Sequence, residues 1–407
     1  MAGALKGIRI LEMAVWHAGP GATLMLSDMG AEVVKIEQPG VGDPMRGLVK
    51  LEGADILNPQ GLSSLMYEIP NRNKKSITVD LTKPQGREIV YRLIPKFDVF
   101  MQNFRPGVAA QLGMDYDTLK KHNPKLIYAN VSGYGPKGPD GGARGQDYIG
   151  LARSGMMTAA YDSDPNQLPH MAPGMADQMT SVTLCWGILA ALLARERQGV
   201  SQEIHVSIVG SMINLQLFRT MASLFLNQEF PPRQRTEMAN PLYNHYRCKD
   251  DKWVALAVLA SDRVWPVLCE CLGMTELIDD PRFNSTEKRA DNCRELIGIM
   301  DRIFDTKTRD EWMQILRQRK RIICSPVMDI LELPNDPQVT ENNYIVDYDH
   351  PSLENAKVVG FPVTFTETPC AIQAPAPQFG QHTEEVLIEL GDYTWDDIAK
   401  LREEEAI

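Results

Sequence analysis

The first 135 residues alternate short apolar strands with helix-forming segments, and this alternation constrains the fold more than any other feature. Residues 7–12 predict a strand, Gly19-Pro20-Gly21 opens a helix that Gly30 closes, and residues 31–37 predict the next strand. Further strands are predicted at 76–81, 98–103 and 125–132, with a helix over 85–95. This spacing predicts an α/β fold with a doubly wound parallel sheet, which binds its ligands outside the carboxyl ends of the strands.

The length and the change in sequence texture indicate two domains. The chain has 407 residues, more than one domain usually contains, and Pro231-Pro232 predicts a linker. Beyond it, residues 253–259 alternate like a strand, and helices are predicted over 263–272, 291–304 and 308–317. The last helix begins with a capping box, Thr308 with Glu311. A second domain is therefore expected from about residue 230.

Charge and cysteine usage argue against several classes of protein. The formal net charge of −11 argues against a general nucleic-acid surface, because phosphate binding there needs clustered cations. No long uncharged apolar run predicts a membrane span, and residues 1–10 lack the apolar core of a signal peptide. The seven cysteines are odd in number and include no CxxC pair, so neither a disulfide framework nor a zinc cage is expected. A cytoplasmic protein is the expectation.

Gly19-Pro20-Gly21 follows the first strand as a dinucleotide-binding loop would, and Glu37 ends the next strand. The third glycine of that fingerprint is missing, because Leu24 stands where close helix packing requires it. The simpler interpretation is a helix with Pro20 at its first position. In both interpretations, the free N–H groups at the helix start favour a phosphate or another anion.

Basic residues lie in or near loops that are expected to converge at one edge of the sheet: Arg72, Lys74, Lys75, Arg105 and Lys137. Each alone is most simply a solvated surface charge. Together with Asn73 and Asn103, they have the chemistry to hold the phosphates of a nucleotide-like ligand, because cations and amides donate strong hydrogen bonds to phosphate oxygens.

Asp177 precedes an apolar segment, residues 182–194, that is predicted to be a buried helix. Aspartate is a preferred N-cap residue, so by local rules the simplest role of Asp177 is a helix cap. A chemical role is open as well. The helix dipole and free N–H groups would keep the carboxylate ionised, while nearby methionines (Met171, Met175, Met179) would exclude water. An ionised carboxylate in a dry site can act as a nucleophile.

The seven histidines show no HxxxH or HExxH spacing, and the sequence contains neither a GxSxG elbow nor a Walker loop. Metal catalysis, serine hydrolysis and phosphoryl transfer therefore have little sequence support. His17 is the histidine of interest, since it follows the first strand at the expected ligand edge of the sheet.

Ordered motifs run nearly from end to end of the chain: LKGI at 5–8, AGP at 18–20, GAEVVKIE at 30–37, NRNKKSI at 71–77, NFRPG at 103–107, SGYG at 132–135, GILAAL at 187–192, NP at 240–241, SPV at 325–327 and GQHT at 380–383. In these motifs the chain resembles the class III CoA-transferase family, which includes formyl-CoA transferase and the carnitine CoA-transferases. So many ordered matches make chance similarity a poor explanation.

The resemblance implies that Asp177 is the catalytic residue. Its carboxylate would attack the carbonyl of an acyl-CoA to give a mixed anhydride, and an aspartyl-CoA thioester would then be attacked by an acceptor carboxylic acid. Coenzyme A is then a substrate, with no separate cofactor and no metal. The residues implied to bind it are Trp16, His17 and Ala18 near Asp177, and Arg72, Lys74, Lys75, Asn103, Arg105 and Lys137 at the nucleotide and pantetheine portion.

The family also implies the domain layout and the assembly. It places a large CoA-binding domain at 1–225, to which 335–407 return, and a smaller α+β domain at 226–334. Two chains would interlock like links in a homodimer. The partners implied are an acyl-CoA and a carboxylic acid, without nucleic acid or membrane.

The chain departs from the family pattern at three places. Gln38 occupies the place of an adenine-stacking arginine, and the glycine-rich loop of formyl-CoA transferase is absent between Phe230 and Trp253. The α-methylacyl-CoA racemases, which share the fold, use a histidine before an aspartate, but here the pair is Gln146-Asp147. A racemase needs two proton carriers and glutamine cannot be one, so this departure favours transfer. A racemase-like isomerase is the second hypothesis. A CoA-binding protein without turnover is the third.

Overall fold

A computed structural model describes residues 3–57, 64–160, 168, 170–230 and 234–407. The linker predicted at Pro231-Pro232 lies outside these residues. The chain divides into two compact units. The first contains residues 1–158, 170–229 and 343–407, and the second contains residues 159–169 and 230–342.

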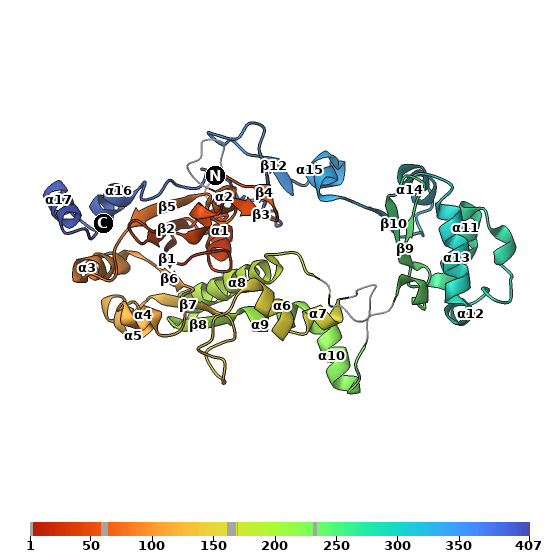
Figure 1. Cartoon of the computed structure of the whole chain (residues 1–407), viewed down its shortest axis with the longest axis horizontal. Coiled ribbons are helices and arrows are strands. Elements are labelled where there is room, and N and C mark those ends of the chain that lie inside the picture. Colours follow the sequence, from red (N-terminus) through yellow and green to blue (C-terminus); the bar gives the residue numbers. More distant parts are fainter. Residues whose placement is uncertain (1–2, 58–63, 161–167, 169, 231–233) are drawn as a thin grey trace. The chain divides into compact units, whose positions relative to one another are not determined.

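The first unit is built on a six-stranded sheet in which every neighbouring pair of strands is parallel (Figure 1). Its strand order is β5-β2-β1-β6-β7-β8. The strands are β1 (Arg9–Met13), β2 (Glu32–Glu37), β5 (Lys74–Thr78), β6 (Val99–Gln102), β7 (Ile127–Ser132) and β8 (Glu203–Ser207). The predicted doubly wound α/β fold is confirmed, because the first three strands run outward in one direction from β1 and the next three in the other.

Both faces of this sheet are covered by apolar side chains, as expected of a parallel sheet. On one face, residues such as Ile10 and Val33 pack with Ala22 of α1 (Pro20–Asp28) and Leu184 of α8 (Met175–Gln198). On the other face, a second core joins the strands to α3 (Pro84–Leu93), α5 (Tyr116–His122), α16 (Thr383–Glu389) and α17 (Trp395–Glu403). Helix α8 is long and apolar enough to cross a membrane by length and composition alone, but it packs against α1, α9 (Ile208–Leu215), β7 and β8. Burial in the core accounts for part of its apolar sequence, and Trp186 and Leu193 of α8 are exposed.

The remaining helices of the first unit are α2 (Leu65–Asn71), α3 (Pro84–Leu93), α4 (Val108–Gln111), α5 (Tyr116–His122), α6 (Asp147–Arg153), α7 (Met156–Ala159), α9 (Ile208–Leu215), α10 (Leu217–Leu226), α16 (Thr383–Glu389) and α17 (Trp395–Glu403). Two short hairpins accompany them, β3 (Lys50–Leu51) with β4 (Ala54–Asp55) and β12 (Ile345–Asp347) with β13 (Lys357–Val359).

The second unit has its own core. Strands β9 (Tyr243–Arg247), β10 (Trp253–Ala257) and β11 (Cys324–Val327) form an antiparallel sheet. The helices are α11 (Ser261–Leu272), α12 (Thr286–Asp291), α13 (Cys293–Phe304), α14 (Arg309–Arg317) and α15 (Pro337–Thr340). The capping box predicted at Thr308 and Glu311 begins α14.

Candidate active site

The loops that carry the predicted site meet where the strand order of the sheet reverses. Strands β1 and β6 are neighbours, but the chain leaves them toward opposite edges of the sheet, and this point of a doubly wound sheet is where ligands bind. A cavity of about 850 Å³ opens there, large enough for a sizeable ligand. Its walls include Val15, Trp16, His17, Ala18, Met45, Leu48, Leu51, Met66, Ile69, Asn103, Phe104, Arg105, Ser132, Arg144, Gln146, Asp147, Asp177, Gln178 and Ile208.

The loop after β1 enters the cavity in an unusual backbone conformation. Trp16 has a φ of 63°, in the left-handed region that a tryptophan rarely adopts. Its indole is 45% exposed and lines the cavity. The preceding peptide is held by Asn103, whose Oδ1 accepts from Val15 N–H at 3.0 Å while its Nδ2 donates to Val15 C=O at 2.6 Å. The loop is therefore fixed from the end of the neighbouring strand β6.

A buried charge network lies beneath the same loop. Asp43 Oδ1 accepts from Trp16 N–H at 3.2 Å, and its Oδ2 lies 3.0 Å from Lys35 Nζ in an ion pair. Lys35 Nζ also bonds to Glu12 Oε1 at 2.7 Å, and Glu12 Oε2 accepts from Lys74 Nζ at 2.8 Å. Burial alone would raise the pKa of Glu12, but the two lysines outweigh it and lower that pKa to about 2. Glu12 thus stays ionised at neutral pH, and its contacts with Lys35 and Lys74 tie β1, β2 and β5 together beneath the site.

Asp177 lies in the first turn of α8, and its predicted role as the helix cap is wrong. The N-cap position belongs to Gly174, with a φ of 84°. The free N–H groups of the helix start are bound by another carboxylate, because Asp147 accepts from Gly174, Ala176 and Asp177 N–H at 3.0, 2.7 and 2.9 Å. Asp147 therefore caps α8, the role that local rules assign to Asp177. Helix capping does not explain why a carboxyl group stands at position 177.

The electrostatic setting of Asp177 also differs from the expectation of a fully ionised carboxylate. Burial and, second, the negative charge of Asp147 raise the pKa of Asp177 to about 7. The expectation failed because the helix N–H groups that would stabilise the charge are bound by Asp147. Around this first turn, Met171, Met175 and Met179 pack against a small apolar cluster, as expected for a dry surrounding. No hydrogen bond to the Asp177 carboxyl group is found within the residues described.

His17 and Gln178 flank Asp177 from two elements. His17 Nε2 lies 2.7 Å from Gln178 Oε1, which fits a neutral imidazole that donates this hydrogen bond. Burial lowers the pKa of His17, against the opposite effect of the Gln178 hydrogen bond. Ser181, one turn along α8, donates to the main-chain carbonyls of His17 and Ala18. The loop and the first turns of α8 are thus held together.

The loop after β7 returns to the site through a close contact between two glycines. A Cβ added at Gly133 would lie 2.4 Å from the Cα of Gly145, so neither position accepts a side chain in this conformation. This contact brings Gln146 and Asp147, at the start of α6, back to the carboxyl end of β7. The sequence indicated a loop here, but not that Asp147 would cap another helix.

The basic residues do not all converge at the site, and that expectation is wrong for three of them. Arg72, Lys74 and Lys75 lie at the amino end of β5, away from the ligand edge of that strand. Their charges face internal carboxylates: Arg72 pairs with Asp28, Lys74 with Glu12, and Lys75 with Glu32 and Glu385. Their assignment to coenzyme A stays a prediction that this placement does not favour.

Two arginines are brought to the cavity instead. Arg105, which the sequence singled out, and Arg144, which it did not, both line the walls and are exposed. Neither guanidinium has a carboxylate partner in the part of the chain that is described, so both are available to an anionic ligand. Lys137 is exposed in the loop after β7 and does not line the cavity. Arg144 has no sequence signal beyond a basic residue in a loop rich in glycine.

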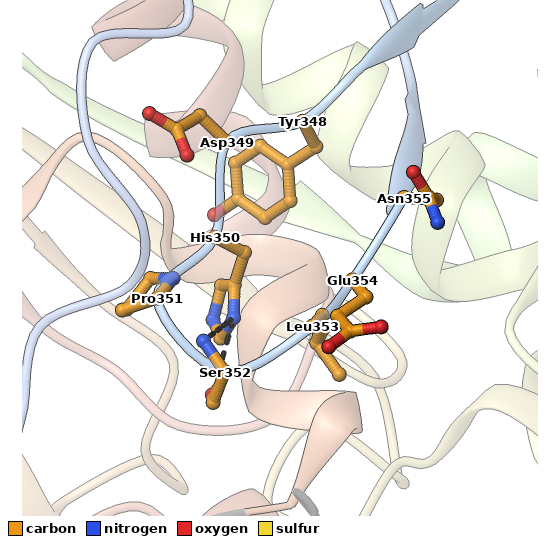
Figure 2. A pocket seen from close by; sticks show the side chains of 8 residues that line it. All are labelled: Tyr348, Asp349, His350, Pro351, Ser352, Leu353, Glu354 and Asn355. Carbon is orange, nitrogen blue, oxygen red and sulfur yellow. Dashed lines mark hydrogen bonds between the residues drawn. The ribbon is translucent and has the colours of Figure 1, made fainter.

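A second concavity, of about 510 Å³, is the inner side of the loop 348–355 (Figure 2). His350 is buried there, with Nδ1 3.2 Å from Ser352 Oγ and Nε2 3.2 Å from Glu68 Oε1 on α2. Tyr348 O–H donates to the other oxygen of Glu68 at 3.0 Å. These contacts fix α2, whose Met66 and Ile69 line the cavity at Asp177.

No group of three or more His, Cys, Asp or Glu side chains suited to a metal ion occurs among the described residues.

Comparisons with known proteins agree with this geometry. A model of CoA-transferase family III matches residues 5–383. The chain is 32% identical to a cinnamoyl-CoA:phenyllactate CoA-transferase of Clostridium sporogenes, covering 99% of this chain and 97% of that protein. It is also 32% identical to a succinyl-CoA:glutarate CoA-transferase of Mus musculus, covering 98% and 88%. A crystal structure of a CAIB/BAIF family protein from Brucella suis superposes with a TM-score of 0.83 at 26% identity, covering 96% of this chain and all of that one. The chain therefore belongs to CoA-transferase family III and is a CoA-transferase.

Proposed function

We propose that the chain moves coenzyme A from an acyl-CoA donor to a carboxylic acid acceptor through covalent intermediates on Asp177. The observation that carries this proposal is a carboxyl group in the cavity wall that has no structural task. Asp147 caps the helix, and the pKa of Asp177 is raised to about 7. A carboxylate that is poorly solvated and free of hydrogen bonds is a better nucleophile than one held by N–H groups.

The steps conserve the thioester. The Asp177 carboxylate attacks the carbonyl of the acyl-CoA, and the C–S bond breaks to give a mixed anhydride and CoA thiolate. The thiolate then attacks the Asp177 carbonyl, releasing the donor acid and leaving an aspartyl-CoA thioester. The acceptor carboxylate attacks this thioester to form a second anhydride, and the thiolate takes the new acyl group and frees Asp177. No net proton is consumed, and no bond is lost to water.

The main chain near Asp177 supports charge stabilisation during these steps. The N–H groups of His17 and Ala18 bind no main-chain or side-chain acceptor within the described ranges, and both residues line the cavity with Asp177. Preorganised N–H donors of this kind stabilise the oxyanion that forms on an attacked carbonyl. The proposed sequence forms such an oxyanion at every step.

The racemase-like alternative needs a second proton carrier on the other face of the substrate. At the corresponding pair, Gln146 cannot carry a proton, and the carboxylate of Asp147 is engaged with three N–H groups of α8. The relatives compared above are CoA-transferases by name. Transfer is therefore preferred to isomerisation, and a binding protein without turnover loses the helix cap as its explanation of Asp177.

The shape of the cavity supports an acyl group or acceptor acid with an apolar body. One part of the wall consists of Met45, Leu48 and Leu51 together with Met66 and Ile69 of α2. An apolar ligand that displaces water from these side chains gains binding free energy, about 25 cal/mol per Å² of apolar surface that it buries. We expect apolar acids, branched or aromatic, to be better acceptors than oxalate.

We also propose that the chain forms an interlocked homodimer. Its large domain would contain residues 1–225 and 335–407, and its small domain residues 226–334. Exposed apolar side chains gather on α10, where Phe218 is 91% and Phe225 77% exposed, and on α8, where Trp186 is 58% exposed. Large exposed apolar side chains such as these are typical of an interface between chains. A cytoplasmic location stays a prediction.

The test is a transfer assay with acetyl-, butyryl-, succinyl- and cinnamoyl-CoA as donors and a panel of carboxylic acids as acceptors. Asp177→Asn should lose transfer by at least about 1,000-fold, because a residue that forms the covalent intermediates cannot be bypassed. Asp396→Asn, another first-turn aspartate on α17, is the matched control and should be unaffected. Full transfer by Asp177→Asn would refute the proposal. Exchange of an α-proton with solvent deuterium, without transfer, would favour the isomerase.

A further inference from the structure

We infer that Asn103 and Asp43 are positioning residues, whose side chains hold the loop Val15–Ala18 against Asp177. The inference rests on the proposed function only in taking Asp177 as the reacting group. The chain keeps an unfavourable backbone conformation at the cavity wall, at Trp16.

The side chain of Asn103 acts as a short extension of the sheet. In the β1–β6 ladder, Met13 pairs with Gln102, and Asn103 is the next residue of that strand end. Its amide makes both bonds to one residue, accepting from Val15 N–H at 3.0 Å and donating to Val15 C=O at 2.6 Å. One lone pair of Oδ1 and one N–H of Nδ2 are therefore used within the protein to hold Val15.

Asp43 holds the next residue from the other side. Its Oδ1 accepts from Trp16 N–H at 3.2 Å and from Met45 N–H at 3.0 Å. Only 1% of Asp43 is exposed, and Lys35, which is fully buried, fixes its other oxygen at 3.0 Å. Lys35 Nζ also donates to Ala14 C=O at 2.6 Å, at the root of the same loop. A buried carboxylate with these partners has one orientation, so Trp16 N–H meets a fixed acceptor.

These contacts oppose the strain at Trp16. A left-handed conformation is unfavourable for a non-glycine residue and persists only where neighbouring contacts impose it. The strained residue sits between Val15, held by Asn103, and His17, whose carbonyl accepts from Ser181 on the helix of Asp177. Without the two side chains, Trp16 would relax to a negative φ, and the positions of His17 and Ala18 relative to Asp177 would change.

The test compares Asn103→Asp with the wild type in kcat, KM for the acyl-CoA and the Kd of coenzyme A. The aspartate keeps the acceptor for Val15 N–H but places an oxygen against Val15 C=O. A displacement of about 1 Å at reacting groups costs about 100-fold in rate. We expect kcat to fall by about 10- to 100-fold, with KM and Kd within about threefold of the wild type.

Asn123→Asp is the matched control. Asn123 also donates from its amide to main-chain carbonyls, of Ile94 and Phe97, and accepts from Lys125 N–H, but it lies outside the cavity walls. It should lose thermal stability to a similar degree and keep kcat. A kcat loss of equal size in both variants would reduce the role of Asn103 to stability and overturn the inference.

Asp43→Asn provides the second variant, with an amide oxygen for Trp16 N–H but no charge for Lys35. It should lower kcat while the folded protein still binds coenzyme A; if it does not fold, Asn103→Asp alone decides. A Kd for coenzyme A weakened tenfold or more in Asn103→Asp, with kcat unchanged, would make Asn103 a ligand and refute the inference. A separate result would show that the aspartyl mechanism itself is wrong: a wild-type enzyme that transfers CoA while Asp177 stays unmodified.

Discussion

The raised pKa of Asp177 predicts a specific pH dependence of the first chemical step. Only the ionised carboxylate can attack the acyl-CoA, so the rate follows the ionised fraction. With a pKa of about 7, about 1% of the groups are ionised at pH 5 and about half at pH 7. An ordinary aspartate with a pKa of about 3.9 would be about 90% ionised at pH 5. The two cases differ by roughly 90-fold in rate at pH 5.

The assay is a single turnover of labelled acyl-CoA with excess enzyme and no acceptor acid. Release of the labelled donor acid reports formation of the aspartyl-CoA thioester, and the rate is measured from pH 5 to pH 9. We expect a tenfold rise per pH unit below about pH 7 and a plateau above it. Hydrolysis is measured in parallel with Asp177→Asn.

A second variant tests the cause of the shift. Asp147→Asn keeps an oxygen for the N–H groups of α8 but removes the negative charge, so the pKa of Asp177 should fall and the rising limb should move to lower pH. The rising part of the pH–rate profile should stay above the pH range of an ordinary aspartate, because burial contributes more than Asp147 to the raised pKa of Asp177. A rate that is flat between pH 5 and pH 8 in the wild type, or a limb that moves upward in Asp147→Asn, would refute the reasoning.

Three further outcomes follow from the structure. The pKa of Asp177 is higher in the folded than in the unfolded chain, so ionisation of this group opposes folding. As the pH rises from about 4 to about 7, the wild type should therefore lose stability relative to Asp177→Asn, by at most about 4 kcal/mol. Urea unfolding of both proteins measures this difference. Asp147→Ala removes the acceptor of three N–H groups and should destabilise the protein by about 1–2 kcal/mol, with faster amide exchange in the first turn of α8. Phe225→Glu should convert the proposed homodimer to monomers in sedimentation experiments, whereas the control Trp395→Glu on α17 should not, and an unchanged dimer would remove α10 from the interface.

Much of the sheet could be predicted from the sequence because its strands are short, apolar and bounded by glycine, proline or helix signals. The predicted strands at 7–12, 31–37, 98–103 and 125–132 match β1, β2, β6 and β7 within a few residues. Strand β5 begins at Lys74 rather than 76, because two lysines at its start conceal a buried strand. Strand β8 was missed, since Glu203 and His205 interrupt its apolar pattern at the edge of the sheet.

The site was predictable only for residues that directly follow a predicted strand. Trp16, His17, Ala18, Asn103 and Arg105 follow the two strands at the reversal point, and all line the cavity. What depends on contacts between distant segments could not be predicted. Capping of α8 by Asp147 joins residues about 30 positions apart, and the pairing of Arg72 and Lys75 with carboxylates depends on which side chains the sheet brings together.

The central claim is that Asp177 carries the acyl group and then coenzyme A. The most direct measurement incubates the enzyme with acyl-CoA, traps the activated carbonyl with hydroxylamine and maps the modified residue by mass spectrometry. The account predicts a hydroxamate at Asp177 that depends on acyl-CoA and is absent from Asp177→Asn. An enzyme that transfers CoA at its full rate while Asp177 stays unmodified would contradict it.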